Sequence, residues 1–245
     1  MYKLAFHVFR IYWLPVLFAS ALLFLLDIWG QGSIGRSLVP TLMVYGYLAF
    51  AFHYTLLTGA TTSVFKISSQ TPSPNWSFWV AFILPIFILL LAMVSTFFII
   101  KAKLPAEALS GDAALGFAML VSLPLFGLLL AAIGTMIPAA AIQASTGVRP
   151  ALKRARRSFW FILWRLITGP TVFTLVFVGV AFTMTQNGLD STVPETFAGI
   201  TFSNATYHTV AGFLGIFNTA LTASIFSMAY TRVEEGRKLQ PSSRT

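Results

Sequence analysis

The sequence contains no cysteine, which excludes disulfide bonds, thiolate nucleophiles and cysteine-ligated metals. Charge is scarce as well: Asp, Glu, Lys and Arg make up 9% of the chain, against about 25% in a soluble domain. Only seven residues are acidic, which leaves little for paired acid and base catalysis. Phosphate-binding loops, nucleophile elbows and zinc-protease motifs are also missing. We therefore predict no catalytic residue, no metal site and no cofactor, and we favour a non-enzymatic protein over an enzyme.

Long hydrophobic runs fill most of the chain. Hydrophobic residues make up 57% of the sequence, and the mean hydropathy is +0.80. A helix needs about 20 apolar residues to cross a hydrocarbon core of about 30 Å. We therefore predict an all-α polytopic membrane protein, with one six-helix transmembrane domain at residues 1–231 and a polar cytoplasmic tail at 232–245. The six transmembrane helices are expected at 11–28, 38–65, 78–100, within 113–144 (with kinks at Pro124 and Pro138), at 166–184 and at 207–230.

Positive charge is concentrated between the predicted fourth and fifth helices. The stretch Arg149–Arg165, RPALKRARRSFWFILWR, carries six of the 16 Lys and Arg residues. Cations are retained on the cytoplasmic side of a membrane, so this stretch is expected to be cytoplasmic. With both termini cytoplasmic, only Arg36, Lys101 and Lys103 lie on the outer side of the membrane. This unequal distribution of Lys and Arg requires an even number of crossings. The same bias explains the net charge of +9. No basic stretch lies on a soluble module, so nucleic acid is not an expected partner.

The basic stretch has the periodicity of an amphipathic helix. Pro150 suits a first helical turn, where its missing N–H costs nothing. Apolar residues recur at helical spacing and are expected to form one side: Leu152, Ala155, Phe159, Ile162, Leu163 and Leu166. The basic residues Lys153, Arg154, Arg156 and Arg157 are expected on the other side, with Trp160 and Trp164 at the boundary. This pattern predicts an interfacial helix in the headgroup plane, before the fifth transmembrane helix.

Two interpretations of these basic residues stay open. In the first, they bind an anionic lipid headgroup or an acidic partner, and the site consists of Arg149, Lys153, Arg154, Arg156 and Arg157. In the second, they serve topology and membrane anchoring alone, since each cation near an anionic leaflet contributes about 1 kcal/mol. A similar basic and aromatic lead, LAFHVFRIYWLPVLF, precedes the first predicted helix. The two leads derive from a duplication or are similar by chance.

Two polar residues lie near the middle of predicted transmembrane helices. His53 is flanked by Tyr and Thr residues, and it either carries a proton or ligand, or forms a neutral structural hydrogen bond. Asn218 lies in a stripe of small and polar residues on the last helix, a pattern that favours helix packing over a substrate path. An intramembrane site that combines His53 with a polar partner stays open.

Two segments resemble a known group of families. The run MIPAAAIQASTGVRPALKRARRSFWFILWRLI and the ending LTASIFSMAYTRVEE are similar to segments of bacterial six-helix inner-membrane families. These families group around the membrane domain attached to some glycerophosphodiester phosphodiesterases, together with uncharacterised relatives. The resemblance covers about a third of the chain and implies a six-helix fold in a bacterial inner membrane. It assigns no catalytic residue, because the phosphodiesterase domain itself is absent from this sequence.

Two functions of different classes follow from the sequence. The first is a non-enzymatic inner-membrane module that interacts with anionic lipid, with another membrane protein or with a second copy of itself. The second is a small transporter or permease subunit with a polar path near His53 and Asn218. Transporters usually place a polar site at the bilayer midplane. The polar lining is thin here, so the first function is favoured.

Overall fold

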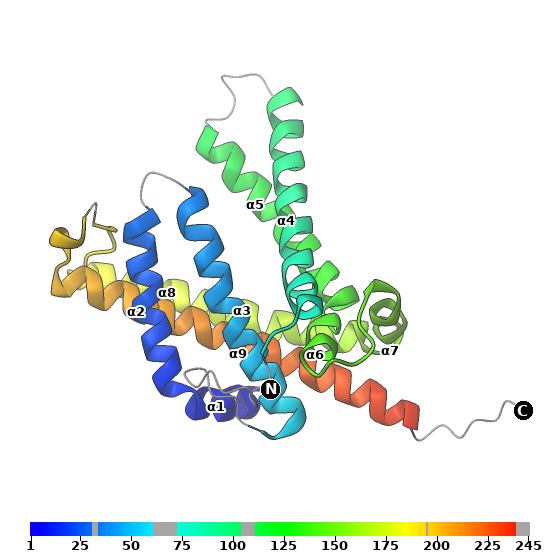
Figure 1. Ribbon diagram of the computed structural model, residues 1–245. Coiled ribbons are helices and arrows are strands. Elements are labelled where there is room, and N and C mark those ends of the chain that lie inside the picture. The colour runs from blue at the N-terminus through cyan, green and yellow to red at the C-terminus, as the bar shows by residue number, and fades with distance from the viewer. Residues whose placement is uncertain (31–33, 61–72, 104–110, 195, 239–245) are drawn as a thin grey trace, which may run out of the picture. The chain divides into compact units, whose positions relative to one another are not determined.

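The computed structural model describes residues 1–30, 34–60, 73–103, 111–194 and 196–238 (Figure 1). Within these ranges all regular secondary structure is helical, which confirms the predicted all-α class. Four helical segments are long and apolar enough to cross a membrane, which indicates a membrane protein: Trp13–Gly30, Trp76–Lys103, Val148–Gln186 and Phe202–Gly236. The end of the second predicted transmembrane helix beyond residue 60 and the tail after residue 238 lie outside the described residues.

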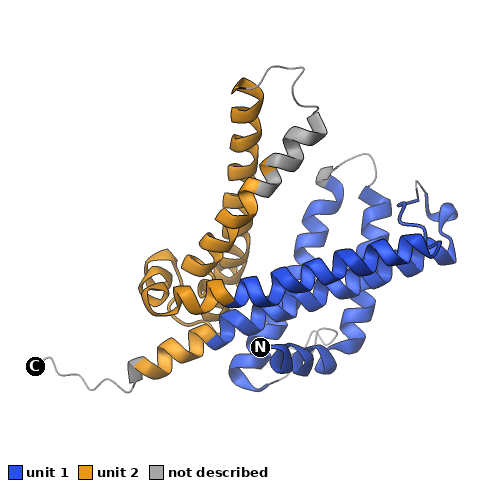
Figure 2. Cartoon of the chain, turned by 180° about the vertical axis from the view of Figure 1, so that it is seen from behind, with its two compact units in different colours: residues 1–74, 165–228 blue, residues 75–164, 229–245 orange. Residues whose placement is uncertain are grey.

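The chain divides into two compact units (Figure 2). Unit 1 consists of residues 1–74 and 165–228, and unit 2 consists of residues 75–164 and 229–245. The last helix, α9 (Phe202–Lys238), contributes its first part to unit 1 and its end to unit 2.

Unit 1 contains α1 (Tyr2–Ile11), α2 (Trp13–Gly30), α3 (Ile34–Thr58), the π-helical turn η1 (Ile167–Thr171), α8 (Val172–Gln186), the short 3-10 helix η2 (Phe197–Gly199) and most of α9. Its core is formed by apolar residues of α1, α2, α3 and α9. The core includes Val16, Phe52 and Ile216, which are fully buried. A separate helix α1 was not predicted: the chain turns at Tyr12 and starts a second helix there.

Helix α9 approaches α2 closely at Gly212. A Cβ atom at this position would lie 3.2 Å from both the Cα and the carbonyl oxygen of Ser20. A methyl group at this position would require the Ser20 backbone to move by a few tenths of an ångström, so glycine suits the close approach of the two helices.

Unit 2 contains α4 (Trp76–Lys103), α5 (Gly111–Ile133), α6 (Met136–Ala141), α7 (Val148–Leu166) and the end of α9. Helix α4 packs against α5 and α6. The predicted fourth transmembrane helix breaks at Gly134 and Thr135, just before α6 begins. Pro138 has no N–H to donate to the carbonyl of Gly134, which explains a break at this point. Pro124 lies inside α5, where the helix continues on both sides of it.

The polar segment that begins at residue 232 starts inside the last helix. Helix α9 continues without interruption to Lys238. Val233 is buried, and Glu234 forms an ion pair within unit 2. The end of α9 is therefore packed, and the reason lies in its contacts with α7.

Candidate functional site

The link between α6 and α7 has a defined backbone shape. Gln143 follows the end of α6 with a positive φ of 55°. The N–H of Ala144 donates to the carbonyl of Ala139 at 2.8 Å, and the N–H of Gln143 donates to that of Ala140 at 3.1 Å. These two bonds form a Schellman motif, which ends the helix and satisfies its last carbonyls. Gly147, with a φ of 113°, then turns the chain into α7 in a conformation that favours glycine.

Arg154 on α7 is directed into this link and is only 5% exposed. Its Nε donates to the Thr135 hydroxyl at 3.3 Å, and its Nη2 donates to the Thr135 carbonyl at 3.5 Å. Its Nη1 donates to the carbonyl and the hydroxyl of Ser145 at 3.4 and 3.5 Å. A guanidinium that is removed from water needs such acceptors, because its hydration is lost on burial.

Arg154 also contacts the end of α9. Its Nη1 lies 3.9 Å from Oε1 of Glu234, and its Cζ lies 5.3 Å from the centroid of the Tyr230 ring. A second cation–π contact joins the same two helices, since Cζ of Arg232 lies 5.3 Å from the ring centroid of Phe161. The end of α9 is thus held against α7 by two arginine side chains, one from each helix.

The face of α7 that is buried differs from the face predicted. The buried residues are Ala151, Arg154, Ala155, Ser158, Ile162 and Leu166, whereas Leu152 is 46% exposed. Arg154 was predicted on the side opposite the apolar residues, and it instead lies on the buried face with Ala151 and Ala155. The physical reason is that Thr135, Ser145 and Glu234 supply polar partners from other segments, which the periodicity of α7 alone cannot reveal.

A cavity of about 650 Å³ lies beside Arg154. It is lined by Ser145, Pro150, Lys153, Arg154, Arg156, Arg157, Val233 and Glu234. Four cationic side chains thus face one carboxylate, and Lys153, Arg156 and Arg157 are exposed. Arg149, the fifth residue of the predicted site, is exposed on the same helix but does not line the cavity. The structure therefore brings four of the five predicted residues together.

The cavity is suited to binding an anion. Arginine guanidinium groups bind phosphate or carboxylate oxygens with two parallel N–H donors, and lysine adds a compact point charge. Arg154 is already bonded to Glu234 and to the link, so its role is to position α7. Lys153, Arg156 and Arg157 are exposed and also line the cavity.

The two predicted intramembrane residues lie in unit 1, and neither lines this cavity. His53 is buried, its Nδ1 lies 2.9 Å from Oγ of Ser227, and its ring stacks on Phe226. Asn218 donates from Nδ2 to the Thr174 hydroxyl at 3.1 Å, which joins α9 to α8. Its Oδ1 is buried and has no hydrogen-bond partner among the described residues.

The sequence did not single out Thr135, Ser145, Tyr230 or Glu234. Thr135 and Ser145 are ordinary polar residues next to a helix end, and nothing in their spacing points to a buried arginine. Glu234 carries a weak signal, because it and Glu235 are the two acidic residues expected on the cytoplasmic side. An acid retained among cations suggests an ion pair, although not with which partner.

No protein-family model matches the chain, and no curated protein or solved structure matches it either. The resemblance to six-helix inner-membrane families therefore stays a prediction from the sequence.

Proposed function

We propose that the protein is a non-enzymatic, multi-pass protein of a bacterial inner membrane that binds the phosphate-bearing headgroup of an anionic lipid in the cavity beside Arg154. The observation that carries this proposal is the grouping of Lys153, Arg156 and Arg157 around one cavity of about 650 Å³. Residues at i, i+3 and i+4 share one face of a helix in any case. What favours a binding site over topology alone is that this face borders a cavity that Ser145, Val233 and Glu234 line from other segments.

The surroundings of the cavity favour a lipid over a soluble anion. Trp160 and Trp164 on α7 are 77% and 67% exposed, and tryptophan is enriched where a membrane meets water. Leu152 is exposed beside Lys153. A helix that presents apolar and basic side chains together fits the headgroup region of a leaflet that contains acidic lipids.

The proposal includes a six-crossing layout with both termini in the cytoplasm. It adds α3 and α5 to the four helical segments that meet the length and hydropathy criteria, and α5 contains the shorter apolar stretch Val121–Ile133. In this layout α7 and the end of α9 lie on the cytoplasmic side, where anionic headgroups and most of the 16 Lys and Arg residues attract each other.

Lipid retention after purification in a mild detergent tests the proposal. The Arg156→Gln variant is expected to lose most of the bound anionic lipid, measured by native mass spectrometry or lipid phosphorus. Arg149→Gln is the matched control, because it removes the same charge from an exposed site on the same helix, outside the cavity lining. Equal losses in the two variants would show diffuse attraction to the surface and would overturn a defined headgroup site.

The layout has its own test, because a chain without cysteine permits single-cysteine labelling without background. A cysteine at the exposed Ser191 is expected to react with a membrane-impermeant maleimide added to intact cells. A cysteine at the exposed Glu235 is expected to react only after lysis. The opposite result at either position would contradict the proposed orientation.

A further inference from the structure

Helix α1 is held in a fixed orientation in unit 1. Ala5, Val8 and Phe9 are buried in the core. The ring of Phe9 packs edge-to-face on Phe213 and Phe217, with centroids 4.7 and 5.1 Å apart. One side of the helix is therefore committed to the core, and the opposite side is presented outward.

A buried hydrogen bond stabilises the turn between α1 and α2. Tyr12, with φ −103° and ψ 22°, separates the two helices. Its hydroxyl lies 2.8 Å from Oγ1 of Thr55 on α3. Helix α1 runs across the end of α2 (Figure 1), and α2 is long and apolar enough to cross a membrane. A helix that runs across the end of a membrane-crossing helix lies close to the plane of the membrane surface.

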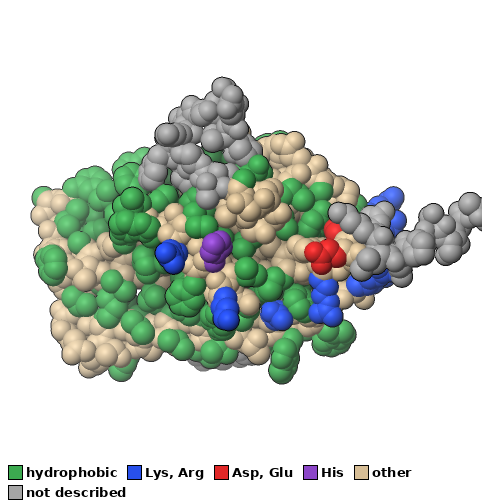
Figure 3. Space-filling model, turned by 90° about the horizontal axis from the view of Figure 1, so that it is seen from below, with side chains coloured by type: hydrophobic (Ala, Val, Ile, Leu, Met, Phe, Trp, Pro, Cys, Tyr) green, Lys and Arg blue, Asp and Glu red, His purple; other side chains and the backbone are tan. Residues whose placement is uncertain are grey.

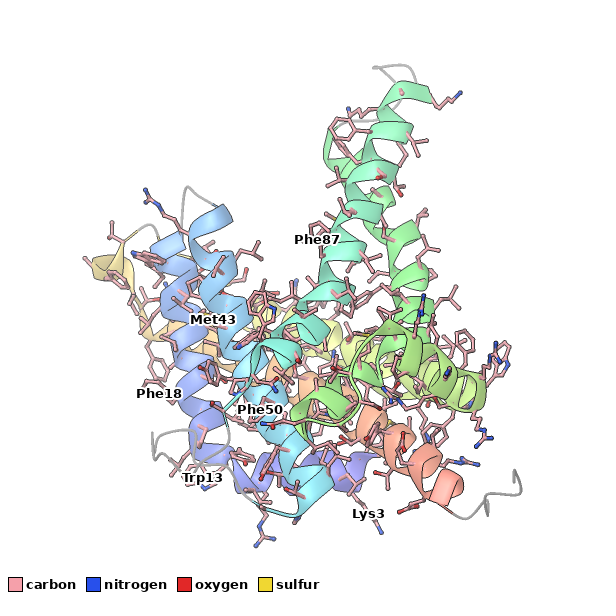
Figure 4. The ribbon with its side chains drawn as sticks, turned by 45° about the vertical axis from the view of Figure 1, so that its right-hand side comes forward. Lys3, Trp13, Phe18, Met43, Phe50 and Phe87 are labelled. Atoms are coloured by element: carbon pink, nitrogen blue, oxygen red, sulfur yellow. The ribbon has the colours of Figure 1, made fainter. Side chains whose placement is uncertain are left out.

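The outward side of α1 combines basic and apolar side chains. Lys3, Phe6, His7 and Arg10 recur at helical spacing on α1, Leu14 follows at the start of α2, and all five are exposed. Phe6 is 61% exposed and Leu14 is 57% exposed. Trp13 is exposed next to this row, and Lys3 and Trp13 both project from the ribbon in Figure 4. Figure 3 shows a surface on which basic and hydrophobic side chains are interspersed.

We propose that the outward face of α1 and the start of α2, formed by Lys3, Phe6, Arg10, Trp13 and Leu14, lies in the headgroup region of a leaflet that contains acidic lipids. Exposed aromatic and leucine side chains next to water are unfavourable, whereas the boundary between headgroups and acyl chains accepts them. The Phe6 ring contacts Phe217 on one side, with centroids 4.9 Å apart, and its exposed part is available to the apolar region. Lys3 and Arg10 flank Phe6, so both can reach lipid phosphates. This surface lies in unit 1 and shares no residue with the cavity.

A membrane leaflet is favoured over a partner protein by two observations. The exposed face continues into α2, which provides a membrane crossing directly after Tyr12. The exposed apolar residues are interspersed with cations, whereas the central part of a protein interface is depleted of charge.

Spin labels on single cysteines in the full-length protein test this proposal. Labels at Phe6→Cys and Leu14→Cys are compared with a label at the exposed Ser191→Cys, after reconstitution into vesicles of phosphatidylethanolamine and phosphatidylglycerol. The labels at residues 6 and 14 are expected to be relaxed by oxygen more than by a water-soluble nickel chelate, and the label at residue 191 is expected to show the reverse. Nickel access at residue 6 equal to that at residue 191 would overturn the proposal. Low access to both reagents at residue 6 would also overturn it, because that result indicates protein packing.

The charge component has a separate readout. With the label at residue 6, the Lys3→Gln/Arg10→Gln variant is compared with the unaltered charges in the same vesicles. Each cation is expected to change the population of inserted side chain roughly fivefold, so nickel access is expected to increase in the variant. With Lys3 and Arg10 unaltered, nickel access at residue 6 is expected to increase by the same amount when phosphatidylcholine replaces the acidic lipid. Unchanged nickel access in both cases would show that acidic lipid is not required. Neither experiment alters a cavity residue. A negative result for α1 therefore leaves the proposed headgroup site in the cavity, which is tested by lipid retention in Arg156→Gln, unaffected.

Discussion

Arg154 and Glu234 form an ion pair, with Nη1 and Oε1 3.9 Å apart, between α7 and the end of α9. Arg154 is almost fully buried, whereas Glu234 is 27% exposed. The pair brings a predicted ligand-binding residue and a predicted tail residue into one contact. As a result, Arg154 acts in the architecture of unit 2, and Lys153, Arg156 and Arg157 line the cavity beside it.

Removal of the Arg154 guanidinium is expected to destabilise the protein. Arg154→Met leaves Glu234 and the acceptors on Thr135 and Ser145 without their donor, so the free energy of unfolding should fall by about 2 kcal/mol. Arg156→Met, at an exposed position of the same helix, should change it by less than about 0.5 kcal/mol. Thermal unfolding in detergent measures both. Equal destabilisation would contradict the assigned role of Arg154.

Removal of the cavity carboxylate is expected to strengthen anion binding. Glu234→Gln eliminates the negative charge that opposes an anionic ligand in the cavity, so the affinity for a soluble phosphate-bearing headgroup such as glycerol phosphate should increase. Glu235→Gln is the matched control, since it removes the same charge from an exposed neighbour outside the cavity lining. Calorimetric titration compares the two. An equal gain in both variants would indicate a general charge effect.

The close approach of α9 and α2 is expected to tolerate only glycine at residue 212. The Cβ atom of Gly212→Ala would meet Ser20 backbone atoms at 3.2 Å, and such overpacking costs about 1–3 kcal/mol. Gly179→Ala on α8 introduces the same methyl group where no atom lies within 4 Å, so it should leave stability unchanged or raise it by up to about 1 kcal/mol. Unfolding midpoints of the two variants check the difference, and a similar midpoint for both would refute it.

The hydrogen bond of His53 is expected to contribute more to stability than a bond within one helix. Ser227→Ala leaves the buried Nδ1 of His53 without the Ser227 hydroxyl at 2.9 Å, which should cost about 1–2 kcal/mol. Ser224→Ala also removes a buried hydroxyl from α9, but that hydroxyl bonds to the Ala220 carbonyl of its own helix. Its cost should be smaller. Denaturant titrations distinguish the two, and an equal cost would argue against a structural role for the His53 contact.

The loop before α9 is expected to lose a stabilising contribution at low pH. Hydrogen bonds from the N–H and the hydroxyl of Thr192, at 2.9 and 2.8 Å, hold the pKa of Asp190 below its usual value of 3.8. Because the pKa of Asp190 is lower in the folded state than in the unfolded state, the Asp190 carboxylate stabilises the folded state above pH 3.8. This stabilisation is lost as the pH falls through the lowered pKa. The difference in unfolding midpoint between the unaltered protein and the Asp190→Asn variant should therefore become smaller as the pH falls below 3.8. A difference that is constant with pH would contradict this assignment.

The positions of most helices could be predicted from hydrophobic length alone. The helix expected at 78–100 is α4 (Trp76–Lys103), and the end of the run at residue 144 corresponds to the end of α6 and its cap. Such runs are strong signals because an exposed polar backbone or side chain is costly in lipid. The grouping of Lys153, Arg156 and Arg157 on one helix could also be anticipated.

The contacts that position the site could not be predicted. Arg154 is buried because acceptors arrive from Thr135, Ser145 and Glu234, and a periodicity argument treats every arginine as exposed. The extension of α9 to Lys238 depends on the same contacts, since the polar sequence after Tyr230 carries no apolar stripe of its own. The turn at Tyr12 was missed for a related reason: its partner, Thr55, lies on another helix.

The link between α6 and α7 has a further consequence. Its shape depends on main-chain conformation at Gln143 and Gly147, and Ser145 of this link lines the cavity. A link whose shape depends on backbone conformation is expected to persist when exposed side chains of α7 are exchanged. Neutral replacements at positions 153, 156 and 157 would therefore vary the charge of the cavity without altering the link, which makes this region a starting point for ligand redesign.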